Sequence, residues 1–124
     1  MFKIINKNQI LINRGDIGII DLTIPISKEE NYEFEQGDVI TFAVYNTNSY
    51  QKDPIIYKEV IVEEDGQTVV TIELDAEDTK VGPVINMPVQ YWYEIQLNKE
   101  QTILGFDDKG PKMFILFPEG SDFN

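Results

Sequence analysis

The side chains of this chain that could do acid–base chemistry are almost all carboxylates. Its 124 residues include 22 aspartates and glutamates but no histidine and no cysteine. This composition excludes Ser-His-Asp triads, thiol nucleophiles, disulfides and thiolate metal sites. The remaining catalytic option is a carboxylate pair of the kind that glycosidases use. Glu59 and Glu94 are candidates, but both lie in amphipathic strands, and we interpret them as solvent-facing residues of a protein that is not an enzyme.

Clusters of acidic residues are a second possible source of chemistry, because calcium binds through several carboxylate and carbonyl oxygens. Three such clusters occur along the chain: Glu63-Glu64-Asp65, Asp75 with Glu77 and Asp78, and Asp107-Asp108. None of them has the spacing, the glycine and the terminal glutamate of an EF-hand loop. We therefore predict that these acids serve turns and caps, and that the chain holds no metal and no other cofactor.

The formal net charge is strongly negative. Acids outnumber bases by 22 to 10, which gives a charge of −12, and Arg14 is the only arginine. Such a surface repels phosphate backbones and anionic lipid headgroups, so we expect neither nucleic acid nor membrane as a partner. The simplest interpretation is solubility. The alternatives are a surface that meets a basic partner or one that mimics DNA.

Length and composition predict a single globular domain over residues 1–124, with a frayed tail at 118–124. Hydrophobic residues make up 42% of the chain, enough apolar surface to offset the entropy lost on ordering. The first residues lack the long apolar core of a signal peptide, and no apolar run approaches the ~20 residues of a membrane span. The expectation is a soluble protein made inside the cell.

Alternating apolar and polar residues predict a chain built from strands. Ile40, Phe42 and Val44 share one face of a segment rich in β-branched and aromatic residues, and similar segments recur between short turn signals. No long stretch has the period of a helix. The expected strands lie at 9–13, 17–25, 38–46, 55–64, 67–74, 89–98, 101–106 and 112–117.

Turn residues suggest how these strands connect. Asp65-Gly66 supplies the positive φ of a tight turn and predicts a hairpin between 55–64 and 67–74, and residues 99–100 predict a second one between 89–98 and 101–106. Residues 75–79 are expected to form one helical turn capped by Asp75. Arg14-Gly15-Asp16, although it spells an integrin-binding tripeptide, is predicted to be a turn. The fold class is an antiparallel immunoglobulin-like β-sandwich of seven to eight strands, with a small β-barrel as the alternative.

Four aromatic residues are the candidate contact residues. If Tyr91 and Tyr93 face the core, a period of two sends Trp92 outward. Trp92 could be buried under a loop or a neighbouring domain edge, could anchor a protein contact, or could stack on sugars with Tyr45 or Tyr57. Tyr50 lies in the polar loop at 46–54, which together with the Pro-rich connection at 79–88 is a predicted contact surface.

The order of strands and turns resembles a family of small β-sandwich modules of phages and prophages of Gram-positive bacteria, which includes the N-terminal domain of baseplate upper proteins. The resemblance covers roughly residues 12–117 and rests on strand and turn signatures. These signatures are Arg14-Gly15-Asp16, Phe34, Gly37-Asp38, Ile40 to Val44, Ile56-Tyr57-Lys58-Glu59-Val60, Ile72-Glu73-Leu74, Glu77-Asp78-Thr79-Lys80, Tyr91 to Leu97, and the closing strand Lys112 to Phe117. One departure is the segment 81–89, which is longer than the short Gly-containing turn that is common in the family.

The resemblance implies a structural building block and transfers no catalytic residue. On this basis the protein is expected to be a non-enzymatic, tail- or baseplate-associated module that is made in the bacterial cytoplasm and resides in the virion. Its partners would be other phage structural proteins or copies of itself, as a homo-oligomer. Two other functions stay open: a carbohydrate-binding module, and an acidic phage-encoded inhibitor that mimics DNA.

Overall fold

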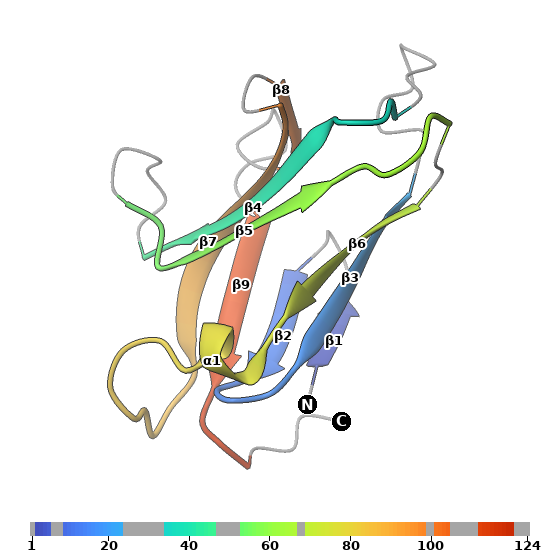
Figure 1. The fold of residues 1–124 in the computed structure, drawn as a ribbon. Coiled ribbons are helices and arrows are strands. Elements are labelled where there is room, and N and C mark those ends of the chain that lie inside the picture. Colours follow the sequence, from blue (N-terminus) through green and yellow to red (C-terminus); the bar gives the residue numbers. More distant parts are fainter. Residues whose placement is uncertain are drawn as a thin grey trace.

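A computed structural model of the protein describes residues 2–5, 9–23, 34–46, 53–66, 69–98, 101–104 and 112–120. These residues form nine strands and one short helix (Figure 1). In chain order the elements are β1 (Phe2–Ile5), β2 (Gln9–Asn13), β3 (Gly18–Thr23), β4 (Val39–Tyr45), β5 (Ile56–Ile61), β6 (Val69–Leu74), α1 (Ala76–Thr79), β7 (Val89–Leu97), β8 (Gln101–Leu104) and β9 (Lys112–Phe117). Each of the eight predicted strand ranges contains one of these strands, and the predicted helical turn is α1. The strand β1 was not predicted, because three of its four residues are exposed and it lacks an alternating pattern.

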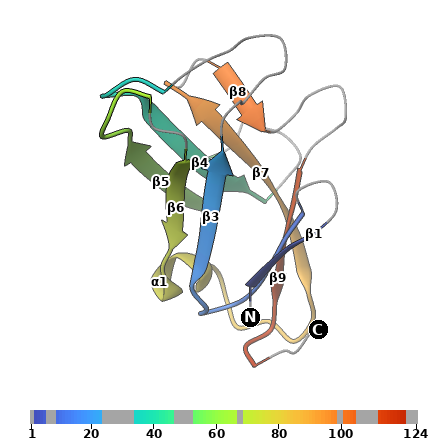
Figure 2. The same ribbon diagram turned by 90° about the vertical axis from the view of Figure 1, so that its right-hand side faces the viewer.

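The strands divide into two sheets. The large sheet has the order β1-β2-β9-β7-β4-β5, with β8 added beside β7, and the small sheet consists of β3 and β6. Figure 2 shows the small sheet lying across from the strands of the large one. The two sheets do not close on each other, so the barrel alternative is wrong.

The large sheet is mixed, whereas a purely antiparallel arrangement was predicted. Its strand β2 runs antiparallel to β1 but parallel to β9, with Ile10 beside Phe114. The prediction was wrong here because alternation shows which residues share a face but not in which direction a neighbouring strand runs. No short turn joins β2 to β9, so nothing local dictates an antiparallel pair.

One of the two predicted hairpins exists. β7 and β8 pair antiparallel, as expected. β5 and β6 do not form the predicted hairpin, because β5 pairs with β4 and β6 pairs with β3. Gly66 has the expected positive φ of 76°. The turn, however, bonds to the segment that precedes β4: Gly66 N–H donates to Phe34 O at 2.8 Å, and the Asp65 carboxylate accepts Gln36 N–H at 2.7 Å. These bonds hold the turn at the point where the chain passes from β5 of the large sheet toward β6 of the small sheet.

The two sheets share one hydrophobic core. Inward-facing residues of the small sheet, such as Ile72, and of the large sheet, such as Phe42, belong to the same buried cluster. The rings of Tyr93 and Phe114 lie 5.5 and 6.3 Å from that of Phe42, at tilted angles that suit aromatic pairs. The face of β4 predicted to be apolar is therefore the face that meets the small sheet.

The helix α1 is a single turn between β6 and the connection to β7. Asp75 occupies its N-cap position as predicted, and its backbone N–H donates to Asp78 Oδ2 at 2.7 Å. The ammonium group of Lys58 lies 3.1 Å from the same Asp78 oxygen, and this hydrogen bond raises the pKa of Lys58. Among the described residues, no helix has the length and apolar character to cross a membrane.

Candidate functional site

The outer face of the large sheet brings together three of the four predicted contact aromatics. Tyr57, Tyr45 and Trp92 belong to the adjacent strands β5, β4 and β7, and Tyr45 is directly opposite Trp92 in the ladder. Two acids, Glu59 and Glu94, lie on the same face by strand alternation. We call these five residues the aromatic–acidic face.

Exposure differs sharply across the aromatic–acidic face. Tyr57 is 46% exposed on the edge strand β5, whereas Tyr45 is 9% exposed and Trp92 is half-buried. Glu59 faces solvent as expected, but Glu94 is only 5% exposed, so its interpretation as a solvent-facing residue was wrong. Glu94 lies on β7, an inner strand that has neighbours on both sides. Strand alternation predicted which face of the sheet Glu94 lies on. Its burial could not be predicted, because that depends on the order of the strands in the sheet.

Burial also changes the electrostatics of this face. It raises the pKa of the Glu94 carboxyl, because a carboxylate loses favourable hydration away from water. Burial, and then the nearby charges of Glu94 and Tyr57, raise the pKa of Tyr45. The Tyr57 hydroxyl donates to Glu59 Oε2 at 2.9 Å.

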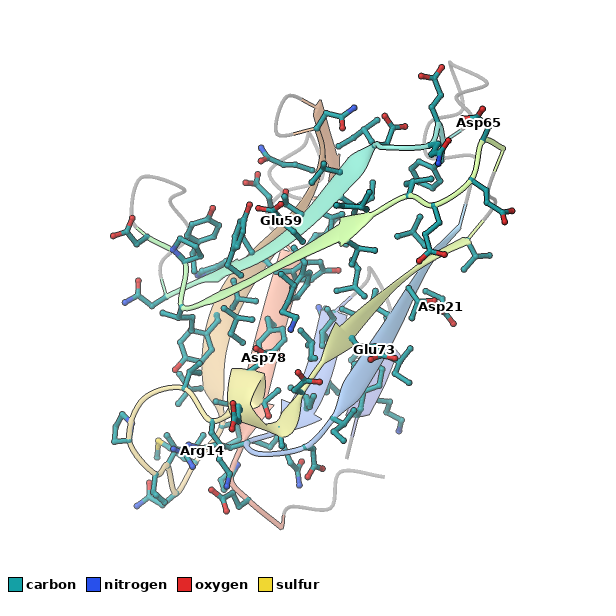
Figure 3. The ribbon with its side chains drawn as sticks, in the orientation of Figure 1. Arg14, Asp21, Glu59, Asp65, Glu73 and Asp78 are labelled. Atoms are coloured by element: carbon teal, nitrogen blue, oxygen red, sulfur yellow. The ribbon has the colours of Figure 1, made fainter. Side chains whose placement is uncertain are left out.

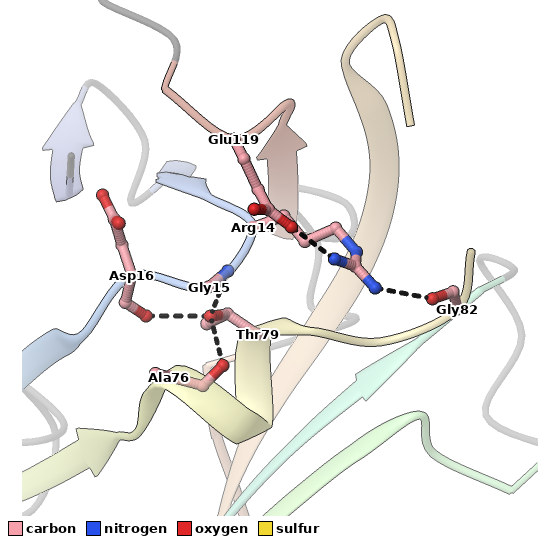
Figure 4. Close-up of polar contacts among 7 residues, drawn as sticks. All are labelled: Arg14, Gly15, Asp16, Ala76, Thr79, Gly82 and Glu119. Carbon is pink, nitrogen blue, oxygen red and sulfur yellow. Dashed lines mark hydrogen bonds and ion pairs between the residues drawn. The ribbon is translucent and has the colours of Figure 1, made fainter. Parts of the chain in front are cut away.

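A second feature is the connection at 81–88, which leads from α1 to β7. Its start is held by Arg14, whose Nη2 donates to Gly82 O at 2.9 Å while Nη1 contacts Glu119 Oε1 at 2.6 Å (Figure 4). Glu119 lies in the predicted frayed tail, of which the structure describes 118–120. One guanidinium thus ties together three segments that are far apart in the sequence.

Thr79 makes the second attachment at the base of this connection. Its fully buried hydroxyl accepts Gly15 N–H at 2.9 Å and donates to Asp16 O at 2.8 Å, with Ala76 O at 3.2 Å (Figure 4). The predicted turn at Arg14-Gly15-Asp16 is confirmed, since Gly15 has a φ of 87°. This turn serves to hold α1 and the segment that follows it.

Beyond this base the connection exposes two large apolar side chains. Val84 is 78% exposed and Met87 is 65% exposed, while Val81 and Ile85 pack against the core. Val81 and Ile85 therefore attach the connection to the core, while Val84 and Met87 point to solvent. Figure 1 shows the connection projecting beside α1, where the chain enters β7.

The acidic residues that the structure describes are spread over several elements. Figure 3 shows Asp21 and Glu73 on the small sheet, Glu59 on β5, Asp65 in the turn after β5, and Asp78 on α1. Within the described ranges, no group of three or more acids is arranged to hold a metal ion. Several described acids instead accept hydrogen bonds from backbone N–H groups, among them Asp38, Asp65 and Asp78.

Some predicted candidates lie outside the described residues, namely Tyr50, most of the polar loop at 46–54, and Asp107-Asp108. The sequence analysis missed the roles of Arg14 and Thr79, which depend on contacts between distant segments. It also missed the burial of Glu94, although the period of two already placed it on the same face as Trp92. In comparisons with family models, curated proteins and solved structures, the chain matched none.

Proposed function

We propose that the protein is a non-enzymatic assembly module of a phage or prophage tail or baseplate, resident in the virion. The observation that carries this proposal is the connection at 81–88. Val84 and Met87 are exposed at a segment whose base is held by Arg14 and Thr79. Large apolar side chains on a fixed segment suit a protein contact, where methionine is enriched and little ordering entropy is lost on binding.

Edges and charge support the same function. Among the described strands, β5 pairs only with β4, so its other side is available to a further strand. The net charge of −12 makes close approach of two copies unfavourable. We therefore favour a different structural protein with a basic surface over a second copy of this chain.

We further propose that the architecture is an immunoglobulin-like sandwich. The neighbouring strands β9, β7, β4 and β5 have the order of the G, F, C and C′ strands of that fold, and β3 beside β6 corresponds to B beside E. The shared core between the two sheets agrees with this assignment. Such a frame would present its loops at the two ends, where the connection at 81–88 lies.

The assembly function is tested by capture from a phage lysate or from co-expressed tail proteins. The wild-type protein is expected to retain a tail or baseplate protein, and Val84→Ser with Met87→Ser is expected to lose at least about tenfold in affinity. Ile19→Ser, at an exposed position on β3, is the matched control and should bind normally. No captured partner, together with a strictly monomeric protein at high concentration, would contradict the proposal.

Carbohydrate binding is the second candidate, because Tyr45, Tyr57 and Trp92 share one face. A sugar platform needs at least two broadly exposed rings, and of these three only Tyr57 is highly exposed. A glycan array tests it directly. DNA mimicry needs carboxylates in rows over one face, and the spread of acids over both sheets and the turns gives it little support (Figure 3).

A further inference from the structure

The strand β1 forms one end of the large sheet and carries exposed apolar side chains. Among the described strands it pairs only with β2. Ile4 and Ile5 are 45% and 39% exposed, although isoleucine is one of the most often buried residue types. An edge strand is a template for a further strand, and proteins usually protect such edges with charges, proline or a covering loop.

The register of β1 shows which of its backbone groups lie on the open side. The backbone N–H of Arg14 donates to Phe117 O of β9 at 2.9 Å, so the backbone groups of Arg14 and of every second residue before it point to β9. Leu11 lies between these positions and therefore points to β1, where it is directly opposite Lys3. Lys3 thus bonds to β2, and the next residue, Ile4, directs its N–H and C=O away from β2.

The same alternation sorts the side chains of β1 between two faces. Ile4 shares a face with Phe2, which packs against the shared core, whereas Lys3 and Ile5 lie on the other face. A strand added beside β1 would place alternate residues next to Ile4 and next to Lys3. Aliphatic residues on the first face and carboxylates on the second would fit best, because opposite charges on neighbouring strands attract.

The charge near β1 differs from that of the rest of the chain. Lys3 and Lys7 are the only charged side chains among residues 1–13, and the first acid is Asp16, in a protein with a net charge of −12. Neither β1 nor β2 contains a carboxylate that could attract a basic segment. An acidic strand would instead meet Lys3.

We propose that the open edge of β1 binds an extended segment of another protein as an added strand, with aliphatic residues beside Ile4 and acidic residues beside Lys3. Backbone hydrogen bonds give such a contact its affinity, and the alternating side chains give it specificity. Pairing of two β1 edges would bring two Lys3 side chains onto one face, which disfavours a second copy of this chain. This contact is separate from the connection at 81–88 and goes beyond the proposed assembly function.

The test titrates isotope-labelled protein with two short blocked peptides, one alternating valine with glutamate and the other alternating valine with lysine. The readout is the set of β1 backbone amide signals in nuclear magnetic resonance spectra. In the free protein the Ile4 amide should exchange with water faster than the Lys3 amide, because only the Lys3 amide bonds to β2. The glutamate peptide should shift the β1 signals saturably and slow exchange at Ile4. The lysine peptide should bind this edge several-fold more weakly, although the net charge of the protein attracts it.

Two pairs of variants separate the edge from general charge effects. Ile4→Pro removes the outward N–H without breaking a bond between β1 and β2, so the fold should be kept while binding of the glutamate peptide falls at least about tenfold. Ile4→Val keeps the N–H and should bind as the wild-type protein does. Lys3→Glu should weaken binding of the glutamate peptide several-fold. Lys80→Glu, which makes the same charge change at an exposed position at the end of α1, should alter it by less than about twofold.

Three results would overturn the proposal: β1 signals that the glutamate peptide leaves unshifted, equal binding by Ile4→Pro and Ile4→Val, or tighter binding of the lysine peptide at this edge. A concentration-dependent shift of the same signals without peptide would assign the edge to a second copy and overturn it as well. If Ile4→Pro does not fold, equal binding by Lys3→Glu and the wild-type protein serves as the contradicting result. Val84→Ser with Met87→Ser should leave peptide binding unchanged, so this inference and the assembly function can fail separately.

Discussion

Gly18 of β3 lies directly against the ring of Phe2 in β1. A Cβ atom built on Gly18 would come within 2.7 Å of Phe2 Cδ1, with Ile12 Cδ1 at 3.0 Å. This contact brings the small sheet close to the β1 edge of the large sheet, where Phe2 packs against the shared core. Gly18 is thus required by close approach of another strand and not by an unusual backbone angle.

Gly18→Ala is expected to destabilise the protein by about 1–3 kcal/mol, because the added methyl overlaps a packed ring. The measurement is the free energy of unfolding in urea. Gly18→Ala combined with Phe2→Ala should cost clearly less than the sum of the two single changes, since the smaller side chain makes room for the methyl. Simple additivity would show that Phe2 does not pack on Gly18 in solution.

Thr79→Val should destabilise the protein by about 1–3 kcal/mol, because it removes the hydroxyl that serves both Gly15 N–H and Asp16 O in a buried position. The shape of the side chain is kept, so the loss reports on hydrogen bonding. Thr71→Val is the control: Thr71 donates to Asp21 on the exposed face of the small sheet, and we expect a change below about 0.5 kcal/mol. Equal losses in urea unfolding would contradict a special role for Thr79.

Arg14→Lys is expected to loosen the connection at 81–88 while leaving the rest of the fold intact. A lysine keeps the charge but cannot contact both Gly82 and Glu119 with a planar fork. Hydrogen exchange followed by mass spectrometry should show faster exchange at 81–88 and unchanged protection in β4 and β7. Glu119→Gln keeps the bond to Gly82 and should retain most of the protection. Slow exchange in Arg14→Lys would show that the core contacts of the connection suffice.

Glu94→Gln should stabilise the protein near neutral pH, and the gain should vanish in acid. Because burial raises the pKa of Glu94 above its ordinary value of 4.5, the folded state holds this proton more tightly than the unfolded state. Below pH 4.5 both states are protonated and the carboxyl costs no charge burial. As pH rises through the raised pKa, the charge must be buried and wild-type stability falls relative to the variant. Tyr45, Tyr57 and Glu59 share this face and are present in both proteins.

This pH dependence is measured by thermal unfolding of both proteins between pH 4 and 8, with Glu64→Gln as the exposed control. The difference in melting temperature between Glu94→Gln and the wild-type protein should widen as pH rises. A constant difference would mean that the Glu94 carboxylate is hydrated in the folded protein.

The amino-acid sequence by itself determined the positions of eight of the nine described strands and the two faces of each. Alternation of side chains is a local property, so segments such as the one around Ile40, Phe42 and Val44 could be located and oriented without coordinates. The cap at Asp75 and the positive φ at Gly66 were equally local, because they depend on the chemistry of one or two neighbouring residues.

Only the tertiary structure decided which strands are neighbours, and the corrections to the barrel, the sheet direction, the first hairpin and Glu94 have that origin. Asp65-Gly66 can make the same turn in a hairpin or in a connection between two sheets. In this protein the turn bonds to Phe34 and Gln36, and the strands on either side of it belong to different sheets. Glu94 is covered because β7 lies inside the sheet, and Arg14 meets Gly82 because distant segments converge. Side-chain period is encoded along the chain, whereas strand order, burial of a given face and long-range hydrogen bonds arise from the packing of all the strands together.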